Sequence, residues 1–179
     1  MPIFFFFFFY SSEIQIFTVW MKSLVLNGNG CTIYDSYGRI VYRVYKYACK
    51  SSTEVYLMDD RGRTLTKILR KKLRIFRQWE GFQGDGLIVE KQEPWFRVRK
   101  TRRYFNRGQN FAAEVTDIII KLAIRSLVHQ ARVTTVKRKL TSHGVALGED
   151  VITLIVEPNH DRLLVTGLVI VCGLINRRM

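Results

Sequence analysis

The sequence predicts a mainly β fold in which one antiparallel sheet surrounds an apolar helix near the C-terminus. Three observations lead to this expectation. Apolar and polar residues alternate over residues 31–44 and 54–69, as they do in half-buried strands. An Asp-x-x-Gly-Arg turn divides each stretch, at Asp35 and at Asp59, and a repeat of this kind is typical of consecutive antiparallel hairpins. Residues 163–175 are almost entirely apolar.

The first strands are expected in chain order around these two hairpins. Residues 17–21 are aromatic and β-branched, which favours a strand. The two hairpins follow at 31–44 and 54–69. Residues 73–82 predict a further strand, which we expect a glycine-rich turn at 81–86 to end.

The next strand is expected at residues 95–100. Side chains alternate between the two faces of a strand, so Phe96 and Val98 should point into the core. Arg97 and Arg99 should then point outward. This strand therefore predicts an apolar inner face and a basic outer face.

The last strands lead into the apolar helix. Residues 104–134 fit either a strand or an amphipathic helix, and we expect a strand. Residues 131–139 and 151–157 alternate clearly and predict two more strands. The helix over 163–175 should begin after Asp161, whose side chain can cap it.

The apolar helix is too short to cross a membrane. Residues 163–175 would be about 20 Å long as a helix, against about 30 Å for the hydrocarbon core of a bilayer. A helix that is apolar on all sides is normally buried on all sides. We therefore expect it inside the curved sheet, with a membrane anchor as the competing interpretation.

The N-terminal stretch is unusual. Residues 4–9 are six consecutive phenylalanines, without the basic region or the cleavage site of a signal peptide. We expect residues 1–15 to be a disordered tail or an artefact of the gene model, and residues 16–179 to form one domain.

Charge is the main indication of function. The 179 residues carry 29 Lys and Arg against 15 Asp and Glu, a formal charge of +14. Between Arg61 and Arg107 there are 15 basic and four acidic residues, so +11 of this charge lies in one stretch. Such a concentration attracts polyanions, either anionic membrane lipids or nucleic acid. A basic but solvated surface without a partner is the competing interpretation.

No pattern in the chain predicts catalysis. The three histidines are scattered, no nucleophile elbow or phosphate-binding loop occurs, and Cys31 and Cys172 fit small buried apolar residues. Three cysteines at wide spacing fit a reducing compartment. We therefore expect a protein that is neither an enzyme nor secreted, without metal or cofactor. We expect it in the cytoplasm, at the periphery of the plasma membrane, or in the nucleus.

The candidate anion-binding residues are the basic ones on the expected strands. They are Arg70, Lys71, Lys72, Arg74, Arg97, Arg99, Lys100, Arg102, Arg103, Lys137, Arg138 and Lys139.

Several sequence blocks closely resemble the plant LURP-one-related family. They are Phe17–Leu24, Gly28–Cys31, Asp35, Gly38–Val44, Glu54–Asp59, Arg70–Leu73, Trp79–Gly81, Lys91–Lys100, Val136–Lys139, Leu147–Val151 and Gly173–Asn176. The family is similar in fold to Tubby C-terminal domains and phospholipid scramblases, which implies a twelve-stranded antiparallel barrel around a C-terminal helix. Relatives carry a third hairpin where this chain departs from the pattern, at about 104–132, so we expect either an incomplete barrel or an error in the gene model.

The resemblance also implies a function. It favours a monomeric, non-enzymatic protein that binds anionic, phosphoinositide-like lipid head groups and is linked to plant defence. A nucleic-acid or protein-interaction module is the alternative, since Trp79, Phe82, Trp95, Tyr104 and Phe105 lie among arginines. The competing interpretation places these aromatic residues in the protein core. A truncated paralogue without function is a further alternative.

Overall fold

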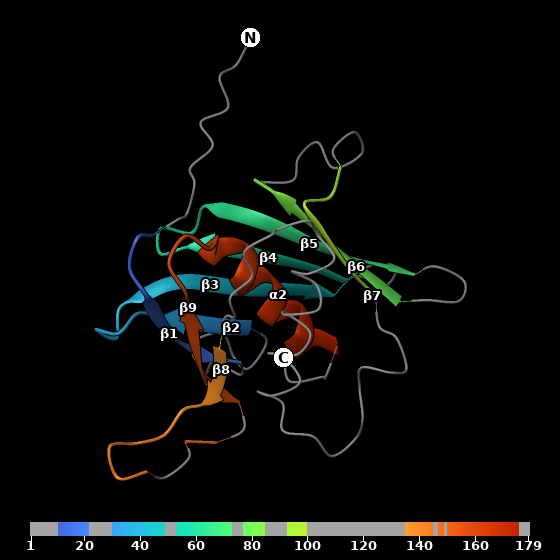
Figure 1. Cartoon of the computed structure of the whole chain (residues 1–179). Coiled ribbons are helices and arrows are strands. Elements are labelled where there is room, and N and C mark those ends of the chain that lie inside the picture. Colours follow the sequence, from blue (N-terminus) through green and yellow to red (C-terminus); the bar gives the residue numbers. More distant parts are fainter. Residues whose placement is uncertain are drawn as a thin grey trace.

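The computed structural model describes residues 11–21, 30–48, 53–72, 77–84, 93–99, 135–144, 147–148 and 150–175. Within these ranges, nine antiparallel strands form one curved sheet that holds a single helix (Figure 1). The strands are β1 (Gln15–Trp20), β2 (Gly30–Tyr34), β3 (Ile40–Ala48), β4 (Thr53–Asp59), β5 (Thr64–Lys72), β6 (Arg77–Gln83), β7 (Phe96–Arg99), β8 (Thr135–Arg138) and β9 (Val151–Val156). The helix is α2 (Arg162–Ile175). The mainly β fold with one C-terminal helix is therefore confirmed.

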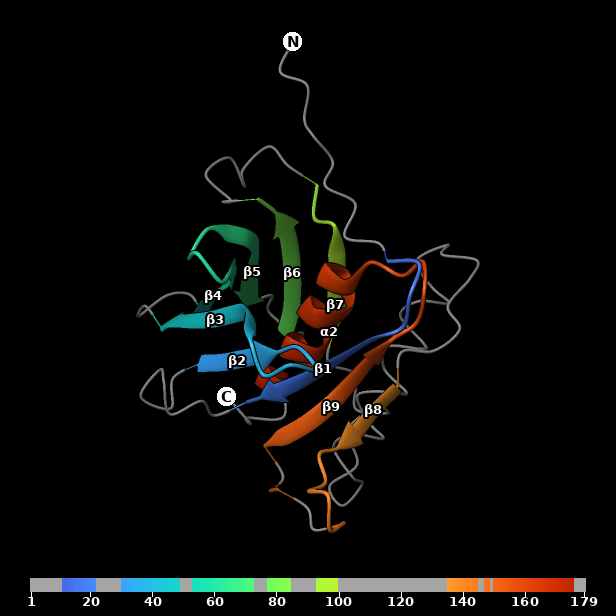
Figure 2. The same ribbon diagram turned by 90° about the vertical axis from the view of Figure 1, so that its left-hand side faces the viewer.

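The sheet begins as a meander and ends by returning to its first strand. Strands β1 to β7 each pair with the next in chain order. β9 pairs with the other side of β1, so that Gln15 lies opposite Val156 and Trp20 opposite Val151 (Figure 2). β8 pairs with β9, which gives the order β7-β6-β5-β4-β3-β2-β1-β9-β8.

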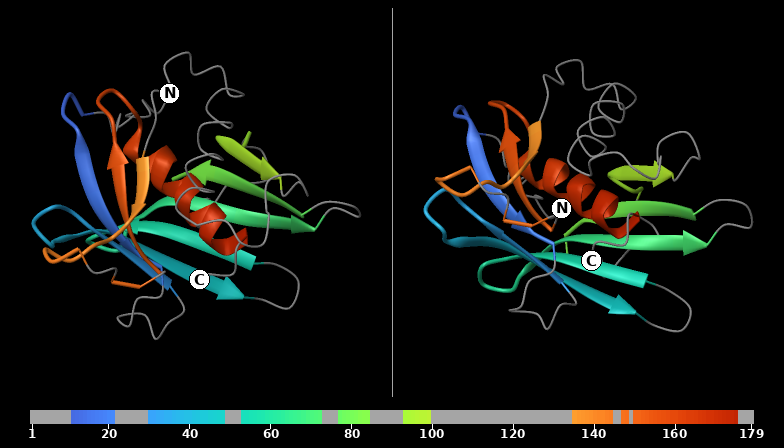
Figure 3. Two further views of the ribbon diagram at one scale, coloured as in Figure 1. Left: turned by 60° about the horizontal axis from the view of Figure 1, so that its bottom comes forward. Right: turned by 90° about the horizontal axis from the view of Figure 1, so that it is seen from below.

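The sheet curves around α2 without closing within the described residues. β7 and β8 are the two ends of the strand order, and the helix lies in the hollow of the sheet (Figure 3). The described strands therefore form an incomplete barrel around the helix. The strand expected within 104–134, and the departure from the family pattern at 104–132, lie outside the described residues.

The core consists of the inward side chains of the strands. Val19, Ile33, Val44, Leu57 and Ile68 come from five consecutive strands and have no exposed surface. They alternate with outward-pointing residues, because successive side chains of a strand point to opposite faces. Burying an aliphatic side chain of this size stabilises a fold by about 1.5–3 kcal/mol.

Helix α2 fills the space inside this core. Its residues from Val165 to Gly173 are all buried. The carboxylate oxygen Oδ1 of Asp161 accepts hydrogen bonds from the backbone N–H groups of Leu163 (2.8 Å) and Leu164 (3.1 Å). The predicted N-terminal cap and the predicted burial of the helix are both confirmed.

The two repeated hairpins have the same turn chemistry. In the β2–β3 turn, Oδ1 of Asp35 accepts from the backbone N–H groups of Tyr37 and Arg39, at 2.9 Å each. In the β4–β5 turn, Oδ1 of Asp59 does the same for Arg61 (3.0 Å) and Arg63 (2.8 Å). The Asp-x-x-Gly-Arg signature therefore encodes the turn itself.

Each of these turns also neutralises its own charge. Arg39 Nε lies 2.8 Å from Asp35 Oδ2, and Arg63 Nε lies 2.7 Å from Asp59 Oδ2. Burial acts to raise the pKa of Asp35, but its hydrogen bonds and ion pair with Arg39 outweigh that effect and lower it. The same balance lowers the pKa of Asp59. The arginines of the repeat are thus structural and add no net charge to these turns.

The end of β6 differs from the expectation. The strand runs through Gly81 to Gln83, and the turn begins only at Gly84, whose φ is +82°. Gly81 is a strand residue opposite Phe96, and the Phe96 ring occupies the space that a side chain at 81 would fill. The prediction of a turn at 81 was therefore wrong, because this glycine serves close packing within the sheet.

The described chain begins at Ser11. The Ser11 carbonyl accepts a hydrogen bond from the backbone N–H of Asn159 at 2.8 Å, next to the first residue pair of β1 and β9. Residues 1–10, with the six phenylalanines, lie outside the described residues.

Candidate anion-binding surface

The predicted basic residues fall on three strands. Arg70, Lys71 and Lys72 lie on β5, Arg97 and Arg99 on β7, and Lys137 and Arg138 on β8, with Lys139 directly after it. Arg74, Lys100, Arg102 and Arg103 lie outside the described residues, as do the side chains of Lys72 and Arg99.

Lys71 and Arg97 meet on the outer face of β5, β6 and β7. Both contact Glu80 of β6: Lys71 Nζ lies 2.9 Å from Oε2, and Arg97 Nε lies 3.3 Å from Oε1. The strand register causes this, since Glu80 lies directly opposite Arg97 and Gln78 directly opposite Lys71. Two cations from different strands therefore share one carboxylate. We call Lys71, Gln78, Glu80 and Arg97 the shared-carboxylate cluster.

Glu80 is the buried centre of this cluster. Its side chain is 6% exposed, whereas those of Lys71 and Arg97 are 52% and 59% exposed. Gln78 Nε2 also donates to Glu80 Oε1 at 2.6 Å. Burial acts to raise the pKa of Glu80, but the hydrogen bonds from Lys71 and Gln78 and the nearby positive charges lower it overall. The cluster therefore has a net charge of +1 with both cationic groups facing solvent.

Arg70 lies on the other face of β5. Its guanidinium carbon is 5.9 Å from the centre of the Trp79 ring, and Trp79 is 5% exposed. Adjacent residues of a strand point to opposite faces, so Arg70 and Lys71 cannot serve one flat surface. Arg70 and Lys71 therefore lie on different faces of the sheet.

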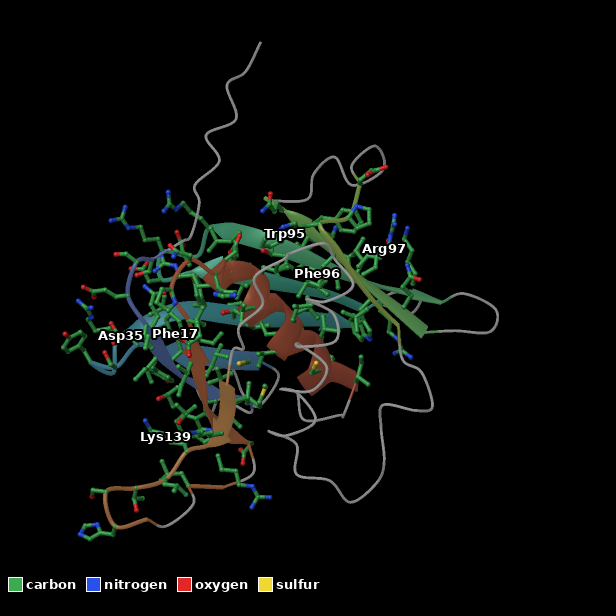
Figure 4. The ribbon with its side chains drawn as sticks, in the orientation of Figure 1. Phe17, Asp35, Trp95, Phe96, Arg97 and Lys139 are labelled. Atoms are coloured by element: carbon green, nitrogen blue, oxygen red, sulfur yellow. The ribbon has the colours of Figure 1, made fainter. Side chains whose placement is uncertain are left out.

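Lys137, Arg138 and Lys139 form a second group at the other end of the sheet. Lys137 and Arg138 are exposed and Lys139 is half-buried. No carboxylate in the described part of the chain lies within ion-pairing distance of Lys137 or Lys139. In Figure 4, Arg97 and Lys139 are far apart, on different sides of the molecule. The basic residues thus form two separate groups, and we call this one the β8 basic group.

Sequence reasoning missed the acidic partners on the outer face. Besides Glu80, Glu54 accepts a 2.6 Å hydrogen bond from the Tyr56 hydroxyl and lies 3.3 Å from Lys67 Nζ. The hydrogen bond from Tyr56 is the main reason that the pKa of Glu54 is lowered. The only local signal for these partners was the alternation of side chains along each strand, which places Glu54 and Glu80 on the outer face.

A comparison with known families agrees with this architecture. The sequence profile described as LURP-one-related matches residues 15–173. The chain belongs to the LURP-one-related family.

Relatives and a solved structure support the assignment. Protein LURP-one-related 11 of Arabidopsis thaliana is 36% identical over 184 residues, covering 93% of this chain and 80% of the relative. Protein LURP-one-related 4 of the same plant is 39% identical over 173 residues, covering 92% and 80%. An X-ray structure of an Arabidopsis thaliana protein matches with a TM-score of 0.51 at 12% identity, over 94% of this chain and 95% of that one. That structure supports the fold alone.

The aromatic residues among the arginines of this LURP-one-related protein belong mainly to the interior. Trp79 is 5% exposed, Phe82 is 2% exposed, and Trp95 is half-buried. Phe96 and Val98 are buried while Arg97 is exposed, as period two predicted. Tyr104 and Phe105 lie outside the described residues.

The described part of this family member contains few side chains that could act in catalysis or bind a metal ion. Cys31 and Cys172 have no exposed surface, which confirms them as buried apolar residues, and burial raises the pKa of the Cys31 thiol. Within the described ranges, no three His, Cys, Asp or Glu side chains are grouped to hold a metal ion. No helix among the described residues is both long and apolar enough to cross a membrane.

Proposed function

We propose that this LURP-one-related protein binds anionic phospholipid head groups at a membrane surface and catalyses no reaction. The observation that carries the proposal is the β8 basic group, in which Lys137 and Lys139 have no carboxylate partner among the described residues. A basic side chain near an anionic membrane surface contributes about 1 kcal/mol. Lys137 and Lys139 occupy alternate positions and can face one surface, so together they contribute about 2 kcal/mol. That is enough for reversible attachment.

The shared-carboxylate cluster supports a second, weaker contact. Lys71 and Arg97 are about half exposed, so each can donate to a phosphate while it remains paired with Glu80. The residual charge of +1 makes the electrostatic attraction of this cluster smaller than that of the β8 basic group.

Lipid is favoured over nucleic acid by the position of the aromatic side chains. Single-stranded nucleic acid is bound by stacking bases on exposed aromatic rings. Trp79 and Phe82 are almost fully buried and offer no such surface. The resemblance to Tubby domains, which include phosphoinositide binders, also favours lipid. We also propose that the protein is cytoplasmic and monomeric and is linked to plant defence. These parts of the proposal rest on the same resemblance and on the cysteine content.

Vesicle flotation tests the proposal. Phosphatidylcholine vesicles with phosphatidylinositol bisphosphate should recover the protein, and vesicles without it should not. The recovery should fall as salt rises, because the attraction is between charges. Equal recovery with both vesicles, unaffected by salt, would contradict the proposal.

Charge-matched variants locate the binding site. Lys137→Ala with Lys139→Ala should weaken binding about 30-fold. Lys71→Ala with Arg97→Ala should weaken it less. The control is Arg39→Ala with Arg61→Ala, which removes two exposed cations from hairpin turns that hold their own carboxylates. The control should bind as the wild type does.

A further inference from the structure

The connection between β8 and β9 extends away from the body of the protein. It runs from Lys139 to Asp150, and the structure describes all of it except residues 145, 146 and 149. In Figures 1 and 2 this connection, drawn in orange, reaches beyond the end of the sheet. It is therefore an outlying part of the surface, and we call it the β8–β9 loop.

The β8–β9 loop is held in a defined shape. The backbone N–H of Gly144 donates to the Thr141 carbonyl at 3.0 Å, and Gly144 has a φ of +77°. Nearer the sheet, the N–H of Leu147 donates to the Lys139 carbonyl at 3.0 Å. The N–H of Lys139 in turn donates to the Val151 carbonyl at 3.1 Å. The loop thus continues the β8–β9 pairing into a hairpin tip.

Two leucines are exposed on the arms of this hairpin. Leu140 is 53% exposed and Leu147 is 52% exposed, and they lie on the two arms of the hairpin. A single exposed leucine is ordinary. Two exposed leucines on one outlying hairpin offer apolar surface that no described part of the chain covers. Removing that surface from water is energetically favourable.

The chain places three cations directly beside these leucines. Lys137, Arg138 and Lys139 immediately precede Leu140. A surface that combines apolar side chains with adjacent basic ones is suited to the boundary between head groups and acyl chains of an anionic bilayer. The cations match the negative charge of the head groups, and the leucines reach the apolar layer beneath them.

Other exposed apolar side chains lack this combination. Tyr37 is 82% exposed on the β2–β3 turn, but there Arg39 is paired with Asp35 and lies 5.2 Å from the ring of Tyr37. Ile14, just before β1, is 55% exposed, and Ile16 of β1 is 45% exposed. The charged residue beside them in the chain is Glu13, an acid. Among the described residues, the β8–β9 loop is thus where exposed leucines adjoin Lys137 and Lys139, which have no ion-pair partner there.

We propose that the β8–β9 loop inserts into the interfacial layer of an anionic lipid bilayer. Leu140 and Leu147 enter the acyl boundary while Lys137 and Lys139 contact the head groups. This inference rests on the proposed head-group binding and adds the part of the molecule that faces the membrane. It also implies a component of binding that salt does not remove.

Partitioning onto vesicles tests the inference with the full chain. The probe is a vesicle of phosphatidylcholine with phosphatidylserine, compared with phosphatidylcholine alone. Leu140→Asn with Leu147→Asn keeps every charge and should reduce binding to the anionic vesicles about tenfold or more. Tyr37→Asn, which removes a more exposed ring from a charge-balanced turn, should bind as the wild type does. Thermal unfolding of each variant checks that the fold is intact.

A fluorescent label gives a second readout. An environment-sensitive dye on Leu140→Cys, in a chain with Cys49→Ser, should shift to shorter wavelength on anionic vesicles. The same dye on Tyr37→Cys should not shift. Cys31 and Cys172 are buried and do not compete for the label.

The outcomes separate this inference from the proposed function. If the wild type binds anionic vesicles but the leucine variants bind equally and the dye does not shift, insertion is overturned and head-group binding stands. A shift of the dye on phosphatidylcholine alone, equal to that on anionic vesicles, would overturn both, because the proposed insertion depends on anionic head groups. Absence of binding to either vesicle would overturn both.

Discussion

The ring of Phe96 in β7 lies against the backbone of Gly81, the residue directly opposite it in β6. The same ring approaches Gly167 of α2, where an added Cβ would lie 3.2 Å from Phe96 Cε1. Phe96 is 9% exposed. One aromatic side chain thus joins the last strand of the meander to both its neighbour and the helix, and two glycines make room for it.

A methyl group at Gly81 should therefore be strongly destabilising. We expect Gly81→Ala to lower the free energy of unfolding by about 2–3 kcal/mol, because the Phe96 ring has to move out of its packed position. Urea unfolding followed by circular dichroism measures this change.

Gly167→Ala is the matched control. Its Cβ would meet the Phe96 ring at a tight but tolerable distance, and alanine favours a helix over glycine by about 1 kcal/mol. We expect a net change below about 1 kcal/mol. Equal losses at Gly81 and Gly167 would contradict this account of the packing.

The cap of α2 should contribute measurably to stability. Asp161→Ala leaves the N–H groups of Leu163 and Leu164 without their acceptor and should cost about 1 kcal/mol. Asp161→Asn keeps an oxygen acceptor and should retain most of the stability. A midpoint of thermal unfolding that falls equally for both variants would show that capping is not the cause.

The two hairpin aspartates should differ in importance. The side chain of Asp59 is 12% exposed and that of Asp35 is 17% exposed, with the same set of hydrogen bonds. We expect Asp59→Ala to cost about 2 kcal/mol and Asp35→Ala about 1 kcal/mol, since the more buried turn leaves its freed N–H groups less hydrated. Chemical unfolding of both variants, with Asp60→Ala as a neighbouring control, measures the difference.

Glu80 should contribute to the loss of stability in acid. Its pKa is lowered from the reference value of 4.5 in the folded protein, so the native state binds its proton less readily than the unfolded chain does. The stabilisation is present above the unfolded-state pKa and is lost as pH falls through the lower native value.

The variant Glu80→Gln should remove this part of the pH dependence. We expect the difference in unfolding free energy between wild type and variant to be largest near pH 7 and to shrink below about pH 4. Urea unfolding across this range measures it. A difference that stays constant with pH would mean that the carboxylate charge of Glu80 is not stabilising.

Several features were predictable because they depend on near neighbours in the chain. The Asp35 and Asp59 turns are closed by hydrogen bonds within five residues, and the alternation of Phe96, Arg97 and Val98 follows from the geometry of one strand. The same alternation separates Arg70 from Lys71, so local reasoning contained the signal against grouping them. The glycine at 81 was misjudged because its partner lies on another strand.

The sequence by itself determined the β fold, the buried helix, the two hairpin turns and the presence of a large positive charge. Those properties follow from composition and short-range pattern. Only the tertiary structure decided that Lys71 and Arg97 share Glu80, and that the β8 basic group lies apart from them beside two exposed leucines. The physical reason is strand register: it pairs residues that are distant in the chain, and it depends on how the whole sheet packs around α2.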